Sequence, residues 1–275
     1  MANYLIRIVP FIFLIAFTLH PFLGFSEASS ATKLTVTAPA LLPDIPELKE
    51  ARSLVDMGKL LEARDQYRSL LTQNDLAAEV KRNARKELDQ LNIDILFSPI
   101  ETEDSIIYVV KEGDNLHNIA KKHKVTVTLI KKSNHLTKDI IKPGQKLKIS
   151  TAKFSIEVDK SDNTLQLFAD DMILKTYKVG TGADNSTPVG EFKITEKLEN
   201  PTWYHDGKAI PPDSPDNILG TRWMGFSLDS YGIHGTTFPE TIGTQASSGC
   251  IRMYNHEVEE LYTIVPSGTQ VLVKD

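Results

Sequence analysis

Residues Ser247-Ser248-Gly249-Cys250-Ile251-Arg252-Met253 contain the only cysteine of this 275-residue chain, and Ile233-His234-Gly235 lies a short way before them. A single thiol cannot form a disulfide within its own chain, so nucleophilic chemistry, metal binding or burial remain for it. Only the thiolate attacks a carbonyl carbon, and a cysteine with an ordinary pKa of about 8.5 supplies little thiolate at neutral pH. A histidine can take the thiol proton and return it to a leaving amine. The pair therefore indicates a cysteine nucleophile with His234 as its base.

The residues beside this pair suit the same chemistry. Gly235 brings a backbone carbonyl close to His234, so the main chain can orient the imidazole. Gly249 can adopt backbone angles that are closed to other residues. We expect the amides of Ser248, Gly249 and Cys250 to converge as an oxyanion hole. The alternative is that Cys250 is a small buried apolar side chain, as is common for a free cysteine, and that His234 lies in a turn.

His-Gly, a spacer and Ser-x-Gly-Cys-Ile-Arg-Met together resemble the active-site signature of the L,D-transpeptidases, the YkuD-domain family. Residues 187–192, Thr-Pro-Val-Gly-Glu-Phe, resemble that family's Thr-Pro-x-Gly-x-Phe hairpin. Residues 200–203 and 219–223 resemble its substrate-side strand and loop. The resemblance extends from about residue 154 to residue 273, nearly half of the chain. Many members carry histidine where this chain has Ser248, so no role of that second histidine transfers.

The resemblance implies peptide-bond exchange on peptidoglycan. The family's cysteine attacks the L,D bond between the third and fourth residues of a tetrapeptide stem, expels D-alanine and holds the remainder as a thioester that an amine resolves. Carbapenems acylate the same cysteine. Carried over by position, Cys250 is the nucleophile, His234 is the general base and acid, and the Gly235 carbonyl orients the histidine. We expect no cofactor and no metal ion at this site.

Four residues of the matching stretches are expected to bind the stem peptide. Arg252 can hold a carboxylate with its planar guanidinium, although an arginine that holds the loop together is an equal alternative. Ser247 is placed in the same group, with a hydroxyl that bonds nearby backbone as its alternative role. Trp203 and Trp223 belong to the substrate-side strand and loop.

The start of the chain predicts export. An apolar run over residues 8–19 follows a short segment with one positive charge, and Ser26-Glu27-Ala28 supplies a small-x-small cleavage site. This run is short against the roughly 20 residues of a membrane-spanning helix. We expect a cleaved signal peptide over residues 1–28, with an uncleaved anchor as the alternative, and a linker over residues 29–45. The mature protein is expected in the periplasm or cell wall.

The composition indicates a folded chain with an uneven charge. Apolar residues make up 41% and charged residues 24%, which are globular proportions. No disulfide framework exists, so packing must stabilise the fold. The formal net charge is −5, yet residues 107–150 carry ten lysines against three acidic residues. This basic segment is therefore expected to be a separate unit.

The basic segment resembles a LysM module over its full length, and its apolar periodicity predicts a βααβ packet. The resemblance implies a groove that binds N-acetylglucosamine-containing glycans. Nucleic acid is the alternative partner, but Tyr108 is the only aromatic residue among these lysines, and an exported chain does not meet nucleic acid. The histidines here lack cysteine partners, so zinc is not expected. The positions that match the glycan groove are Gly113, Asp114, Asn115, where the family usually has threonine, Leu116, Asn134 and His135.

Residues 46–98 lack an internal proline and follow the spacing of a tetratricopeptide helix pair, with Gly58 at the turn. A third helix over about residues 75–97 is expected to cover this hairpin. One repeat is fewer than an independent array needs. The apolar stripe of the third helix is expected to be domain core, with a groove for a protein partner as the alternative.

We therefore expect an α+β multidomain chain with a helical hairpin region over residues 46–98, a LysM module over 107–150 and a mainly β catalytic domain over 153–275. Within this last part, a helix is expected from Asn255, as its N-cap, to the residue before Pro266. The expected activity is formation of peptidoglycan cross-links. Other acceptors would give lipoprotein attachment, D-amino-acid exchange or, with water, L,D-carboxypeptidase activity. The alternative from another class is a wall-binding scaffold with an inert cysteine.

Overall fold

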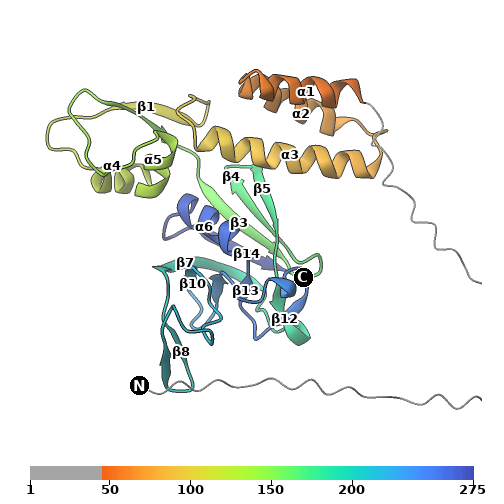
Figure 1. Cartoon of the computed structure of the whole chain (residues 1–275), viewed down its shortest axis with the longest axis vertical. Coiled ribbons are helices and arrows are strands. Elements are labelled where there is room, and N and C mark those ends of the chain that lie inside the picture. The colour runs from red at the N-terminus through yellow and green to blue at the C-terminus, as the bar shows by residue number, and fades with distance from the viewer. Residues whose placement is uncertain (1–44) are drawn as a thin grey trace, which may run out of the picture. The chain divides into compact units, whose positions relative to one another are not determined.

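The computed structural model describes residues 45–275, and the predicted signal peptide and residues 29–44 of the predicted linker lie outside them. Three helices come first: α1 (Pro46–Asp56), α2 (Leu60–Thr72) and α3 (Ala78–Leu96) (Figure 1). Their apolar faces form a small core of their own, so the predicted helical hairpin with a covering third helix is confirmed. Gly58 makes the first turn at a φ of +74°, which glycine adopts without steric cost. No helix in the described range is long and apolar enough to cross a membrane.

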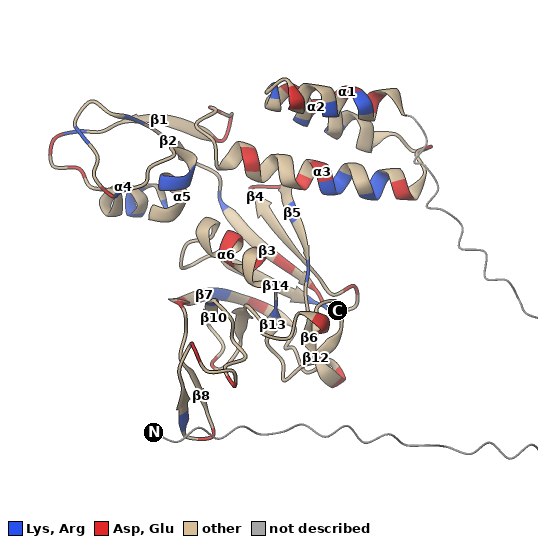
Figure 2. Ribbon diagram, viewed as in Figure 1, with Lys and Arg blue, Asp and Glu red and all other residues tan. Residues whose placement is uncertain are grey.

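The basic segment forms the predicted βααβ packet. Strands β1 (Ser105–Val109) and β2 (Lys146–Ser150) pair antiparallel, and α4 (Leu116–His123) and α5 (Val127–Ser133) connect them. Both helices carry lysines in their last turn, where positive charge suits the negative end of the helix dipole (Figure 2).

The C-terminal half is built on one curled sheet of eight strands in the order β13-β11-β10-β7-β14-β3-β4-β5. Neighbouring strands are antiparallel except for the pairs β14–β3 and β11–β13. The helix α6 (Asn255–Ile264) lies against this sheet (Figure 1). The strands and single-turn helices are β3 (Phe154–Asp159), β4 (Thr164–Ala169), β5 (Met172–Lys178), β6 (Thr181–Gly182), η1 (Ala183–Asn185), β7 (Gly190–Glu199), β8 (Trp203–His205), β9 (Lys208–Ile210), β10 (Arg222–Phe226), β11 (Gly232–His234), η2 (Pro239–Thr241), β12 (Gln245–Ser247), β13 (Ile251–Arg252) and β14 (Gln270–Lys274).

Helix α3 covers the edge strand β5 with polar contacts as well as packing. The Asn92 side-chain amide donates to the Leu174 carbonyl at 3.0 Å, and the Thr176 N–H donates to the Asp89 carboxylate at 3.0 Å. An uncovered strand edge offers unpaired backbone groups to other chains. The helical region therefore completes one edge of the catalytic sheet.

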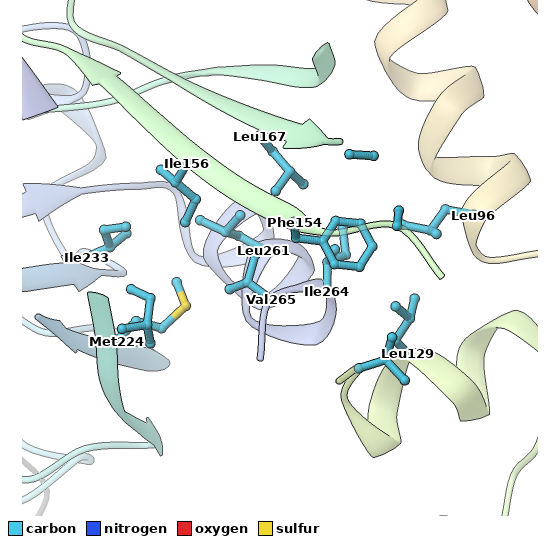
Figure 3. Close-up of a cluster of buried hydrophobic side chains, with 14 of the residues drawn as sticks. Leu96, Leu129, Phe154, Ile156, Leu167, Met224, Ile233, Leu261, Ile264 and Val265 are labelled. Carbon is cyan, nitrogen blue, oxygen red and sulfur yellow. The ribbon is translucent and has the colours of Figure 1, made fainter. Parts of the chain in front are cut away.

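The module over residues 107–150 shares its core with the catalytic part. Figure 3 shows Leu129 of α5 and Leu96 of α3 directed toward Phe154 of β3 and Ile264 of α6, and all four belong to one cluster of buried side chains. Lys148 is 2% exposed, and its ammonium donates to the carbonyls of Ile95, in the last turn of α3, and of Ser98, just after the helix. The predicted separate unit is thus continuous with its neighbours through the core.

Candidate active site

Strand pairing brings the two key segments together. Strand β11 ends at His234, and its parallel partner β13 begins one residue after Cys250. The register places Ile233 opposite Ile251 and His234 opposite Arg252. The histidine and the cysteine therefore meet at one edge of the sheet because two short parallel strands align there.

The imidazole of His234 is held from its Nδ1 side. Nδ1 lies 2.5 Å from the Gly235 carbonyl oxygen, which can only accept, so Nδ1 carries the proton. His234 is 2% exposed, and burial lowers its pKa to about 4. The carbonyls of Gly235 and Leu219 oppose this shift. At neutral pH the ring is uncharged and its Nε2 is free to accept a proton.

The thiol of Cys250 is half-buried and protonated at neutral pH. Burial raises its pKa, against smaller opposing effects from the Gly232 backbone and the Arg252 charge. The thiol donates to the Ser230 carbonyl, with 3.5 Å between sulfur and oxygen. With no ligand bound, the site therefore contains a neutral thiol and a neutral imidazole.

The loop before the cysteine differs from the expected oxyanion hole in one donor. The Gly249 N–H donates to the Ser247 hydroxyl at 3.0 Å, and that hydroxyl donates to the Cys250 carbonyl at 2.6 Å. The Gly249 N–H is therefore not available to an oxyanion. The expectation that this amide contributes to the oxyanion hole is wrong. Ser247 takes its alternative role, because its buried hydroxyl is occupied by backbone. Gly249 has a φ of +124°, and a Cβ there would lie 2.7 Å from the Tyr231 ring, so only glycine fits.

A cavity of about 590 Å³ opens onto the thiol and the imidazole. The β8–β9 hairpin forms one wall, where the Trp203 ring stacks on His205 with centroids 4.5 Å apart. The Trp223 ring stacks on His234 at 5.9 Å. These aromatic walls offer apolar area around a few polar groups, as binding cavities usually do. Both tryptophans predicted to bind substrate thus line the cavity.

Arg252 lies in the strand after the cysteine and lines the cavity. Its backbone N–H and carbonyl pair with Gly180, which fixes the strand after the cysteine. Its side chain lines the cavity, and its buried Nε has no hydrogen-bond partner among the described residues.

Two asparagines contribute to the site although the sequence patterns did not predict it. Asn217 donates to the Pro201 and Ile210 carbonyls and accepts from the Leu219 N–H, so it closes the base of the β8–β9 hairpin. Asn255 is the first residue of α6, whereas Tyr254 is the N-cap and has no side-chain cap bond. The expectation that Asn255 caps the helix is therefore wrong, because its amide bonds to other segments.

Most residues of the predicted glycan groove also have structural contacts inside the module. Asn115 caps α4 by accepting from the Asn118 N–H, and the Asp114 carboxylate accepts from the Tyr108 hydroxyl. The Asn134 amide is paired with the backbone of Ile130 and Lys148. Leu116 is buried, whereas Gly113 and His135 are exposed. The two matching loops are present, and of the predicted positions Gly113, Asn115 and His135 are exposed.

No group of three or more histidine, cysteine or acidic side chains within residues 45–275 is arranged to hold a metal ion.

Two family models match the chain: one for the L,D-transpeptidase catalytic domain, YkuD, over residues 153–273, and one for the LysM domain over residues 108–150. The putative L,D-transpeptidase YqjB of Bacillus subtilis (strain 168) is 46% identical over 124 residues, which are 43% of this chain and 69% of that protein. The putative L,D-transpeptidase YkuD of the same strain is 33% identical over 175 residues, which are 61% of this chain and 98% of that protein. Among solved structures, the NMR structure of the catalytic domain from the E. faecium L,D-transpeptidase aligns with a TM-score of 0.38 and 27% identity, over 45% of this chain and 98% of that one.

Proposed function

Because the chain belongs to the YkuD family of L,D-transpeptidases and carries a LysM domain, we propose that it transfers an acyl group from a peptidoglycan stem peptide to an amine through a thioester on Cys250. One observation carries this proposal. The Cys250 thiol opens into the same cavity as His234, whose Nδ1 proton is held by the Gly235 carbonyl, so that Nε2 is free to accept.

In the first half-reaction, sulfur attacks the carbonyl of the L,D bond while the thiol proton moves to His234 Nε2. The carbon–nitrogen bond of the tetrahedral intermediate then breaks, and the imidazolium returns the proton to the departing D-alanine amine. The neutral resting pair fits this sequence, since burial raises the pKa of Cys250 and lowers that of His234, so that the proton leaves sulfur only during attack.

The developing oxyanion needs donors that are not already used. The Ser248 and Cys250 amides are the proposed donors, because the Gly249 amide bonds to Ser247. Gly249 contributes through its backbone conformation.

On the substrate side, Arg252 is proposed to bind a stem-peptide carboxylate, since its side chain lines the cavity and its buried Nε has no hydrogen-bond partner within residues 45–275. Trp203 and Trp223 are proposed to pack on the apolar parts of the stem. In the second half-reaction an acceptor amine attacks the thioester carbonyl while its proton moves to His234 Nε2. The carbon–sulfur bond then breaks, and the imidazolium returns the proton to the Cys250 sulfur.

The two domains together indicate where in the cell envelope the enzyme acts. The LysM module is proposed to bind glycan strands through the loops around Gly113 and His135. The enzyme would then act in the periplasm or cell wall, after export directed by the N-terminal segment. A cross-linking transpeptidase is the activity proposed, with a stem-peptide amine as acceptor.

The experiment is an incubation of the purified protein with a disaccharide tetrapeptide, followed by mass analysis of the products. Cross-linking predicts a dimer that is lighter than two donors by one D-alanine. A tripeptide product would show that the enzyme is an L,D-carboxypeptidase and does not form cross-links. Unchanged tetrapeptide would contradict catalysis and support the scaffold alternative.

A further inference from the structure

The side chain of Asn255 joins three segments behind the active site. Its Oδ1 accepts from the backbone N–H of Thr236 at 3.1 Å and from that of Thr221 at 3.3 Å. Its Nδ2 donates to the Thr236 carbonyl at 3.1 Å. One amide therefore links the start of α6, the segment after β11 and the loop before β10.

The contact reaches the histidine through a single peptide group. The Thr236 N–H and the Gly235 carbonyl belong to the same planar peptide, and His234 Nδ1 donates to that carbonyl at 2.5 Å. Fixing the N–H end fixes the direction of the carbonyl. A hydrogen bond at the N–H end also polarises the group and makes its oxygen a better acceptor. Asn255, this peptide and the imidazole thus form one hydrogen-bonded chain.

Two glycines leave the space that this amide occupies. A Cβ added at Gly220 or at Gly235 would lie 2.2 Å from Asn255 Oδ1, well inside contact distance. Gly220 also has a φ of +63°, which favours glycine. The closeness of Asn255 is therefore a steric reason for glycine after the histidine. This glycine gives the carbonyl to His234, and it admits Asn255.

We propose that Asn255 is a positioning residue for His234, holding the Gly235–Thr236 peptide so that the imidazole keeps its proton on Nδ1 and presents Nε2 to the thiol. This inference rests on the proposed function of the Cys250 site. It assigns to Asn255 no contact with the substrate or with the reacting atoms.

Two variants distinguish the role of the accepting oxygen of the Asn255 side chain from that of its donating nitrogen. Asn255→Ala removes every contact, whereas Asn255→Asp keeps an oxygen for the Thr236 and Thr221 N–H groups and loses the donor to the Thr236 carbonyl. Asn92→Ala is the matched control, since Asn92 is a buried asparagine that bonds backbone at the far edge of the sheet. Thermal unfolding of each variant identifies any that fails to fold.

The readouts are the rate of carbapenem acylation across pH and the ¹⁵N resonances of the His234 ring in the full chain. Asn255→Ala is expected to acylate about 10- to 100-fold more slowly, with ring resonances that show mixed Nδ1-H and Nε2-H tautomers. Asn255→Asp is expected to recover much of the rate, and Asn92→Ala to match the wild type in both readouts.

The proposal would be overturned if Asn255→Ala were acylated at the wild-type rate and its His234 ring resonances were unchanged. It would also be overturned if Asn255→Asp were acylated no faster than Asn255→Ala. If wild-type protein takes up no carbapenem, the proposed function fails, while the ring resonances of the variants still decide the role of Asn255.

Discussion

At the scale of single residues, burial decides the charge of the proposed base. His234 is almost completely enclosed, and this burial lowers its pKa to about 4 against the favourable carbonyls of Gly235 and Leu219. The native state therefore binds fewer protons than the unfolded chain between pH 4 and an ordinary histidine pKa of about 6.5. Stability contributed by neutral His234 is complete above that window and is lost as pH falls through it.

Replacing His234 by Gln should remove this pH dependence. Between pH 7 and pH 4.5 the wild type is expected to lose about 2 kcal/mol more unfolding free energy than His234→Gln, because the variant has no group to protonate. Urea unfolding at both pH values measures the difference. His256→Gln is the control, since its side chain is exposed and should leave the wild-type pH dependence intact. If the unfolding free energies of the wild type and of His234→Gln changed equally with pH, this would contradict a buried neutral imidazole.

The sequence predicted the residues that meet at the site, but not all of their contacts. Cys250, His234 and Gly235 lie in two short local motifs, so their types and spacing are visible in the chain. The hydrogen bond that occupies the Gly249 amide depends on the exact turn of the loop. The bonds of Asn255 depend on three segments that meet only in the folded chain, and an asparagine before a helix is equally typical of an N-cap.

At the scale of elements, α6 is fixed at both ends. Asn255 ties its start to the histidine segment. At its end the Lys197 ammonium, from β7, donates to the carbonyls of Tyr262 and Val265 at 2.6 and 2.7 Å, and lies over the Tyr262 ring. Those carbonyls lack partners within the helix, so a cation there stabilises them. The last turn of α6 is thereby anchored to the central strand of the sheet.

Lys197→Met should destabilise the protein by about 2 kcal/mol, because two carbonyls at a largely buried helix end lose their donor. Denaturant unfolding at neutral pH measures the loss. Lys193→Met on the same strand is the control, since its side chain is exposed and it should stay near the wild type. A stability of Lys197→Met equal to that of Lys193→Met would show that water replaces the ammonium without cost.

The long elements were predictable and the short strands were not. Alternating runs predicted β3 and β4, and helical periodicity predicted α3, which begins three residues later than expected, at Ala78. Strands β11 and β13 have three and two residues, too few for a periodic signal. They pair because β13 joins the end of the sheet beside β11, and this edge exists only in the folded chain.

At the scale of the whole molecule, the LysM part and the end of α3 share one cluster of buried side chains with the catalytic part, whereas α1, α2 and the rest of α3 have a core of their own. Leu129 of the LysM part and Leu96 of α3 bury the same cluster as Phe154 and Ile264 of the catalytic part (Figure 3). The Ser133 hydroxyl also donates to the Leu96 carbonyl at 2.6 Å. The basic charge of residues 107–150 marks a module in the sequence, but charge gives no sign of which apolar faces meet.

Removing residues 107–150 should therefore damage the catalytic part as well as glycan binding. The deletion exposes Phe154 and Leu96 to water and is expected to lower the unfolding temperature by several degrees and to slow carbapenem acylation. Differential scanning calorimetry and intact mass after carbapenem treatment measure the two effects. Lys121→Gln, an exposed change on α4, is the control for charge alone. A deleted chain with wild-type melting and acylation would show that the shared core contributes nothing to the site.

Acyl transfer through Cys250 can be observed by intact mass spectrometry of the protein quenched during turnover with a tetrapeptide donor. We expect a covalent species heavier than the free protein by the donor minus D-alanine, mapped by proteolysis to the peptide that contains Cys250 and absent from Cys250→Ala. Donor consumption by the wild type without such a species, or an equal adduct on the Cys250→Ala variant, would contradict it.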